Sequence, residues 1–194
     1  QLRILRKPSI IILYLSFSIS QERIGDWYCY TSTLNIRDIA VFNGNIYCAT
    51  DGGILQFDIQ SHTFTPFTKL NGLNSTNLSV IETGRDQLLW IGGNAPGFIQ
   101  IFDPLKEMVV SKFPYEFSVI SHIVSGDSIA YAVYRDNQDW GIAEYRYEDG
   151  TFNHRDLYPV WGLAENGIND IEIMDESVFV GTQSGLFKGI TGED

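Results

Sequence analysis

Short runs of apolar residues recur along this chain, and Gly, Pro and Asn separate them. The clearest example is the segment LLWIGGNAPGFIQIFD, in which apolar residues lie on both sides of a glycine-rich turn. This pattern is typical of two short antiparallel strands. It predicts strands at Leu88–Gly92 and Phe98–Asp103, with a turn that contains Asn94, Pro96 and Gly97.

Three weaker copies of this hairpin lie elsewhere in the sequence, at Asn45–Asp58, Ser128–Tyr145 and Ser177–Gly189. One glycine marks the turn of each hairpin, and successive glycines are 44 residues apart: Gly53, Gly97, Gly141 and Gly185. A period of about 40–50 residues with several strands per repeat is typical of β-propeller blades. The sequence therefore predicts an all-β fold, a β-propeller of four-stranded antiparallel blades.

The apolar runs divide the chain into three full blades and most of a fourth, in a ring expected to have seven blades. The first two blades are predicted at Ile36–Phe42, Asn45–Thr50, Ile54–Asp58 and Thr63–Phe67, then Asn77–Glu82, Leu88–Gly92, Phe98–Asp103 and Met108–Phe113. The other two are predicted at Val119–Val124, Ser128–Tyr134, Trp140–Tyr147 and Thr151–Leu157, then Ile168–Met174, Ser177–Thr182 and Leu186–Ile190. A separate strand, Asp26–Tyr30, is expected to form the outer strand of the last blade in a closed ring.

Residues 1–20 have the order of features of an export signal. A stretch with three basic residues precedes the apolar run Ile10–Phe17, and small residues follow at Ser18–Ser20. The run is too short to span a bilayer, which takes about 20 residues. This order predicts cleavage before Gln21, and a buried strand is the alternative. Because the chain begins with Gln and stops inside a repeat, residues 21–194 are interpreted as the N-terminal part of a longer propeller, whose remaining blades would be partners within the same chain.

The charge of the chain narrows the range of partners. The sequence has 13 basic and 24 acidic residues, a net charge of −11. Residues 1–20 include three of the basic residues and no acid, so 10 basic residues remain against 24 acidic ones, a net charge of −14. Such a surface repels phosphate groups, which argues against nucleic acid or anionic membrane as a partner. We expect an exported protein, in the periplasm or at the cell surface, with no membrane insertion after signal removal.

Cys29 and Cys48 are the only cysteines, so the sequence contains no disulfide framework. Export would permit the two to pair. Cys48, however, has apolar neighbours on both sides, which is typical of a small buried thiol. The sequence leaves both states open.

The predicted strand order places the long loops on one face of the propeller. Loops between second and third strands emerge on the same face as connections between blades. The longer ones are Thr68–Thr76, Gly93–Gly97, Arg135–Asp139 and Tyr158–Gly167. Long loops on a rigid scaffold commonly carry function. This loop face is our candidate surface for a protein or glycan partner, although it is also compatible with ordinary solvated loops. Its candidate binding residues are Asn94, Asp136, Asn137, Asp139, Tyr158 and Trp161.

Catalytic and metal-binding motifs are weak. The sequence GDSI at Gly126–Ile129 matches a hairpin turn of the repeat, and no Asp-x-x-His occurs to complete a hydrolase triad. The three histidines fall in different predicted strands or turns, none with a second ligand at zinc-binding spacing. The segment DNQDWG at Asp136–Gly141 is rich in oxygen donors, but its Gln and Trp break the calcium-loop pattern. We therefore expect no enzyme activity, cofactor or metal.

Two segments resemble known propeller families. The sequence NGLNSTNL, followed by LWIGG and Gly97, resembles the two-component-regulator propeller repeat, and residues 166–186 match it more weakly. The opening segment, with DWYCY and then IRDIAVFNGNIYCATDGGILQFD, is similar to the N-terminal propeller of surface proteins of the bacterial type IX secretion system. Blade three departs from the pattern, because Tyr131–Val133 replaces the Trp-Ile-Gly core.

The resemblance implies a structural repeat and specifies no chemistry. Relatives of the first kind are sensor ectodomains of histidine kinases, which often respond to glycans. Relatives of the second kind are surface scaffolds for protein export. The expected function is therefore an exported, non-enzymatic scaffold or interaction module, with a glycan-sensing ectodomain as the alternative and a propeller enzyme as a third hypothesis.

Overall fold

The computed structural model describes residues 30–84, 87–113, 116–137, 139–159 and 167–191. Within these residues the chain is all-β, with fifteen strands and one short 3-10 turn, η1 (Lys69–Asn71). Every strand pairing is antiparallel. No helix in this part of the chain has the length and apolar character to cross a membrane.

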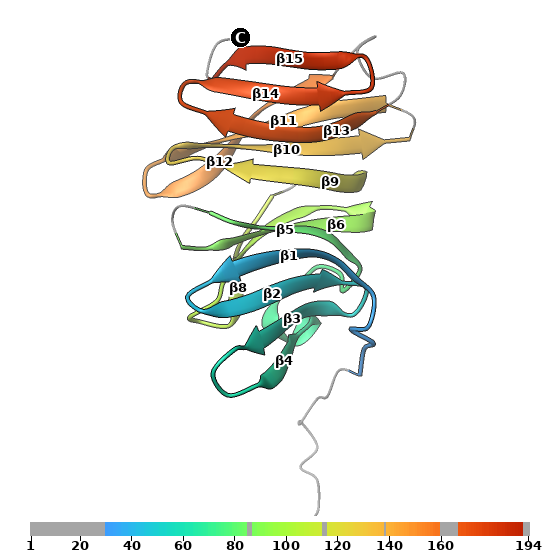
Figure 1. The fold of residues 1–194 in the computed structure, drawn as a ribbon, viewed down its shortest axis with the longest axis vertical. Helices are drawn as coiled ribbons and strands as arrows, with labels where there is room; N and C mark the ends of the chain where they lie inside the picture. The colour runs from blue at the N-terminus through green and yellow to red at the C-terminus, as the bar shows by residue number, and fades with distance from the viewer. Residues whose placement is uncertain (1–29, 85–86, 114–115, 138, 160–166, 192–194) are drawn as a thin grey trace, which may run out of the picture.

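Consecutive strands form four units that follow one another along the molecule (Figure 1). Unit 1 comprises β1 (Ile36–Phe42), β2 (Asn45–Thr50), β3 (Gly53–Asp58) and β4 (Thr63–Phe67). Unit 2 comprises β5 (Leu78–Thr83), β6 (Leu89–Gly97), β7 (Ile99–Asp103) and β8 (Met108–Lys112). Unit 3 comprises β9 (Phe117–Ser125), β10 (Ile129–Asp136), β11 (Asp139–Glu148) and β12 (Thr151–Pro159). Unit 4 comprises β13 (Ile168–Met174), β14 (Ser177–Thr182) and β15 (Gly185–Ile190).

Most predicted strand boundaries agree with these bounds, and β1, β2, β4, β13 and β14 agree to the residue. The main difference is β6, which continues through the predicted turn to Gly97. The extra residues pair with β9 of the next unit, Asn94 with Val119 and Gly97 with Phe117. Units 2 and 3 therefore share one continuous sheet, because hydrogen bonds to β9 satisfy backbone groups that a loop would expose to solvent.

The first strand of every unit carries a β-bulge at the same place. In each strand the register with the second strand shifts by one residue, which leaves Arg37, Ser79, Ser121 and Asn169 as the extra residues. An isoleucine lies two positions after each bulge, at Ile39, Ile81, Ile123 and Ile171. The bulges therefore align the four units residue by residue, although the loops between them differ in length.

The turn glycines agree with this alignment at three of four positions. Gly53, Gly141 and Gly185 each pair with a residue at or near the end of the preceding strand, namely Thr50, Tyr134 and Thr182. In unit 2 the equivalent residue is Phe98, whose carbonyl accepts a hydrogen bond from the Gly93 amide at 2.9 Å. Gly97 thus lies one residue early, and its equal spacing of 44 residues is not a structural equivalence.

The hydrophobic core lies between the units. One cluster joins units 1 and 2, a second joins units 2 and 3, and a third joins units 3 and 4. Each cluster contains one large aromatic residue from the second strand of the earlier unit, at equivalent positions: Tyr47, Trp90 and Tyr131, which are 2%, 0% and 4% exposed. Sheets of four sequential strands, packed face to face through such clusters, are compatible with a partial β-propeller. The number of blades in a complete ring stays a prediction.

Cys48 is a buried free thiol in β2, and its burial raises the pKa of that thiol. Cys29 lies outside the described residues, as do the predicted signal segment 1–20, most of the predicted strand Asp26–Tyr30, and Trp161.

Candidate functional site

The loop face takes its local geometry from Ser118, a residue that sequence reasoning did not single out. The Ser118 hydroxyl donates a hydrogen bond to Asp136 Oδ1 at 3.3 Å and accepts one from the Asn137 amide at 3.0 Å. Asn137 has a φ of 54°, which a tight turn between β10 and β11 requires and which Asn tolerates well. Asp136 and Asn137 are therefore held against the start of β9.

Asn94 lies beside this turn. It pairs with Val119, the residue after Ser118, and its amide donates to the Asn77 carbonyl at 2.9 Å. The Asn77 side chain donates back to the Asn94 carbonyl, so the Asn94 backbone is fixed at both ends while its side chain is half-exposed. The structure thus brings three of the six candidate residues, Asn94, Asp136 and Asn137, to one edge of units 2 and 3.

Asp139 is exposed at the start of β11, directly opposite Asp136. Next to it, the Arg135 guanidinium lies 5.9 Å from the centre of the Trp140 ring, and Arg135 Nε donates to the Asn137 carbonyl at 3.1 Å. Four of the candidate residues therefore share one edge: the β10–β11 turn carries two exposed carboxylates, one amide and one cation, and the second amide, Asn94, lies beside it in β6.

The structure places Tyr158 in a strand, whereas the sequence predicted it at the start of a loop. It lies in β12, which extends to Pro159, and it pairs with Ile142. Its hydroxyl donates to Glu144 Oε2 at 2.9 Å. Arg146 Nε lies 2.5 Å from Glu144 Oε1, and this hydrogen bond raises the pKa of the Arg146 guanidinium. The Tyr158 side chain therefore satisfies a buried carboxylate between units 3 and 4.

A cavity of about 380 Å³ lies where the first strands of all four units meet. Its lining includes charged and hydroxyl side chains, and none of its residues was predicted as a site residue. The titratable members come from β1, β5, β9 and β13: Arg37, Asp38, Glu82, His122, Asp170 and Glu172. The signal in the sequence was weak, because each first strand contributes only one or two of these titratable residues.

Several of these side chains hydrogen-bond to the neighbouring first strand. Asp38 Oδ2 accepts from the Ile81 amide at 2.9 Å, and Ser79 Oγ donates to the Ile120 carbonyl at 2.6 Å. Arg37 donates to the Leu78 carbonyl at 2.6 Å. β1, β5 and β13 are edge strands, and β9 pairs with β6 only near its start, so these side chains satisfy backbone groups that would otherwise be unpaired. The polar side chains that line the cavity therefore also join neighbouring units.

Glu82 is the most perturbed group in the cavity. Desolvation by burial, followed by the nearby carboxylates of Asp38 and Glu172, raises its pKa to about 7. All three effects disfavour the charged form. Among the described residues, no cluster of three His, Cys, Asp or Glu side chains is arranged to hold a metal ion. The cavity therefore places a protonated carboxyl group among acids below neutral pH.

The geometry defines a class: an all-β, antiparallel repeat domain with a polar central cavity and a loop face rich in carboxylates and amides. No family model matches the sequence, and no curated protein matches it. Comparison with solved structures does find similar folds.

Three of these structures illustrate the similarity. The computationally designed Ika4 protein gives a TM-score of 0.63 at 13% identity, over 83% of this chain and 94% of that chain. The extracellular domain assigned to the hybrid two component system BT3049 from B. thetaiotaomicron gives 0.60 at 19% identity, over 78% and 21%. The AfRom2 CNH domain gives 0.59 at 13% identity, over 86% and 56%.

At these identities the similarity concerns the fold alone. This chain spans about a fifth of the two-component extracellular domain and about half of the CNH domain. The match to the two-component extracellular domain supports, at the level of fold, the resemblance to two-component-regulator propellers that the NGL and LWIGG motifs indicate. The resemblance to type IX secretion proteins has no counterpart among these structures.

Proposed function

We propose that this chain is part of an exported, non-enzymatic β-propeller that binds a protein or glycan partner through its loop face. The observation that carries the proposal is the Ser118-centred arrangement, in which Asp136 and Asn137 are hydrogen-bonded to the strand that also pairs with Asn94. Exposed carboxylates and amides on a rigid edge suit sugar hydroxyls or peptide groups, which offer matching donors and acceptors.

The finer assignment, a cell-surface scaffold in type IX secretion, rests on sequence resemblance alone. The alternative is a ligand-sensing ectodomain of a hybrid two-component receptor. It has one additional supporting observation, the similarity in fold to an extracellular domain of such a system. A seven-bladed ring, completed by further blades, belongs to the same proposal.

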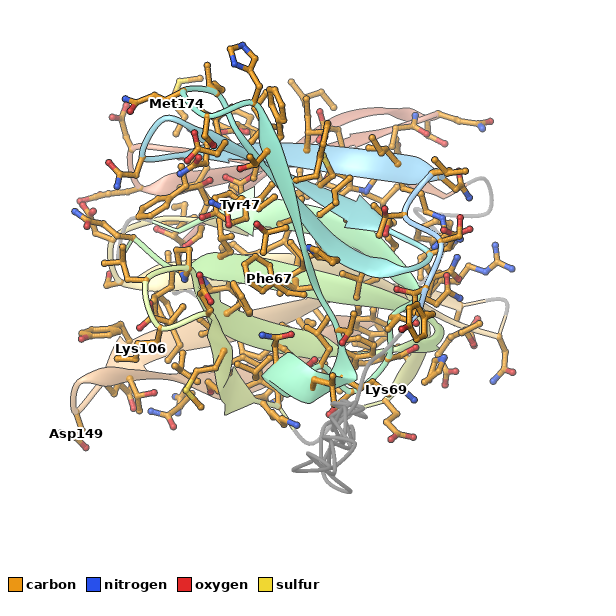
Figure 2. The ribbon with its side chains drawn as sticks, turned by 90° about the horizontal axis from the view of Figure 1, so that it is seen from below. Tyr47, Phe67, Lys69, Lys106, Asp149 and Met174 are labelled. Carbon is orange, nitrogen blue, oxygen red and sulfur yellow. The ribbon has the colours of Figure 1, made fainter. Side chains whose placement is uncertain are left out.

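A charge-reversal pair tests the loop face. In the double variant Asp136→Lys/Asp139→Lys, two exposed carboxylates become cations, so we expect binding on a glycan microarray, or to a purified export substrate, to be lost with the melting temperature unchanged. The matched control is Asp149→Lys/Asp175→Lys, in exposed turns on the opposite face. Figure 2 shows Asp149 at the tip of a hairpin at the molecule's periphery. Binding only to glycans favours the sensor, and equal binding by both variants contradicts the proposal.

A further inference from the structure

A groove runs along the outer edge of the junction between units 2 and 3. It consists of two adjoining cavities, the first of about 320 Å³ and the second of about 410 Å³, which share Ser111, Thr151 and Phe152 in their linings. The last strands of the two units, β8 and β12, form its walls. Figure 2 shows Lys106 and Asp149, in the turns at one end of these strands, on the same side of the molecule. Units 2 and 3 each have all four strands in the structure, so the groove belongs to a junction between two complete units.

Aromatic rings form the floor of the groove. Phe113 and Phe152 are buried, and their ring centres lie 5.7 Å and 4.9 Å from that of the buried Trp90. Tyr147 packs edge-on against Phe152 at 5.2 Å and is 45% exposed. Val110, the extra residue of a β-bulge in β8, also lines the first cavity and is 43% exposed. The first cavity therefore presents apolar side chains to a ligand above a rigid aromatic base.

The charged groups that line the groove have a net positive charge. Lys106 Nζ lies 2.8 Å from Asp103 Oδ2, so these two charges neutralise each other. Lys112, in the wall of the second cavity, donates to the neutral amide oxygen of Asn74 at 3.2 Å and keeps its charge. Burial lowers the pKa of His154, which therefore lines the second cavity as a neutral imidazole at pH 7. The lining thus carries one positive charge in a chain of net charge −11, which complements an acidic ligand.

Both walls of the groove are edge strands. Among the described residues β8 pairs only with β7, and β12 only with β11, so each has one edge of unpaired backbone N–H and C=O groups. An extended peptide can add to such an edge, and its alternate side chains then lie on one face about 7 Å apart. The second cavity extends two residues further than the first along both walls, from Phe152 to His154 and from Ser111 to Phe113. The two cavities therefore have the spacing of alternate side chains of a bound strand.

We propose that this groove binds an extended acidic segment of another protein by strand addition to the free edge of β12. An apolar side chain of the segment enters the first cavity, and an acidic side chain two residues away enters the second, near Lys112. Hydrogen bonds between the two backbones supply affinity, and the two cavities supply specificity. The groove shares no residue with the loop-face candidates, so this proposal is independent of the function proposed above.

Fluorescence anisotropy with labelled peptides of about eight residues tests the proposal on the full chain. The probe has a Thr- and Val-rich background, which favours an extended backbone, with one Leu and an Asp two residues later. A comparison peptide has Lys in place of Asp, and we expect it to bind at least about 10-fold more weakly. N-methylation of alternate backbone amides removes the donors for strand addition and should abolish binding. Equal binding of the Asp and Lys peptides, or of the methylated peptide, overturns the proposal, as does the absence of peptide binding.

Two variants assign the binding to this groove. Val110→Glu places a charge in the first cavity and should weaken binding of the Asp peptide by about 10-fold or more. The matched control is Ile59→Glu, in a residue 46% exposed on the turn between β3 and β4, and it should leave the affinity unchanged. Lys112→Glu, an exposed position, should reverse the preference between the Asp and Lys peptides at an unchanged melting temperature. Unchanged affinity in Val110→Glu, or an unchanged preference in Lys112→Glu, overturns the proposal.

Discussion

Asp38 and Ile81 join the first strands of two successive units, because Asp38 Oδ2 accepts a hydrogen bond from the Ile81 amide at 2.9 Å. Asp38 lies immediately after the bulge of β1, and the bulge turns its side chain toward the free edge of β5. The second oxygen accepts from the Ile39 amide of its own strand. A single carboxylate thus satisfies two backbone donors from different units.

The first prediction concerns this carboxylate. Asp38→Ala leaves the Ile81 amide without its acceptor, so we expect the free energy of unfolding to fall by about 1–3 kcal/mol. The stabilities are measured by urea denaturation at about pH 5.5, where Glu82 is mostly protonated. The charge repulsion between Asp38 and Glu82 then contributes little to the difference between wild type and variant. The control is Asp170→Ala, because the hydrogen bond of Asp170 to the Ile171 amide stays within unit 4. Equal losses in the two variants would show that the Asp38–Ile81 bond contributes nothing measurable.

The second prediction concerns pH. The pKa of Glu82 is about 7 in the folded protein against an ordinary value of 4.5, so the unfolded chain releases this proton first as pH rises. Stability therefore falls as pH rises from about 4.5 to about 7, and is restored on acidification through that window. Because the side chain is half-buried and solvent screens it, we expect a loss of about 1–2 kcal/mol.

Glu82→Gln removes the titrating group while keeping the shape of the side chain. We expect this variant to be more stable than the wild type above pH 7 and to lose the decline between about pH 4.5 and 7. Glu148→Gln, in an exposed residue at the end of β11, is the control and should retain the wild-type profile. Parallel profiles for all three proteins would exclude Glu82 as the cause.

Sequence patterns predicted the strands well for a physical reason. The strands β13 and β14, for example, each show alternating apolar residues and are bounded by turn residues, and both signals are local in the sequence. The loop edge was also predictable in part, because the turn that holds Asp136 and Asn137 follows from strand order. The end of β12 was predicted two residues early, at Leu157, because nothing in the local sequence shows that the strand continues to Pro159, where pairing with β11 decides the boundary.

The central cavity was not predictable from a single sequence. Asp38 and Glu172 are 134 positions apart, and each reads as an ordinary polar residue of a half-exposed strand. Only the packing of four first strands around one space brings them near Glu82. The turn glycines show the opposite problem, in which a sequence pattern suggests more than the structure contains. Their equal spacing includes Gly97, which is not structurally equivalent to Gly53, Gly141 and Gly185.

The third prediction concerns the aromatic position shared by the units. Trp90 is 0% exposed and stacks on Phe113 at 5.7 Å between ring centres, so Trp90→Ala should cost about 3–5 kcal/mol of stability. Its indole Nε1 has no hydrogen-bond acceptor in the described part of the chain. Trp90→Phe removes that unsatisfied donor and should therefore cost less than about 1.5 kcal/mol.

Phe179 provides the matched comparison, since it occupies the same position in unit 4 with no unit packed on it in this structure. Phe179→Ala should therefore cost less than about 1 kcal/mol. Thermal and urea unfolding of the three variants give the ranking. A large loss for Phe179→Ala, or a small one for Trp90→Ala, would contradict the assignment of this position to the contact between units.

The last prediction separates the structural role of Tyr158 from the binding role that its sequence position suggested. Glu144 is 1% exposed and accepts from both Arg146 and Tyr158. Tyr158→Phe removes a donor to a buried charge while keeping the ring, so stability should fall by about 1–3 kcal/mol. Binding of a loop-face partner, measured on the folded protein, should be unchanged, because the Tyr158 hydroxyl donates its hydrogen bond to Glu144. Lost binding at unchanged stability would return Tyr158 to the binding surface.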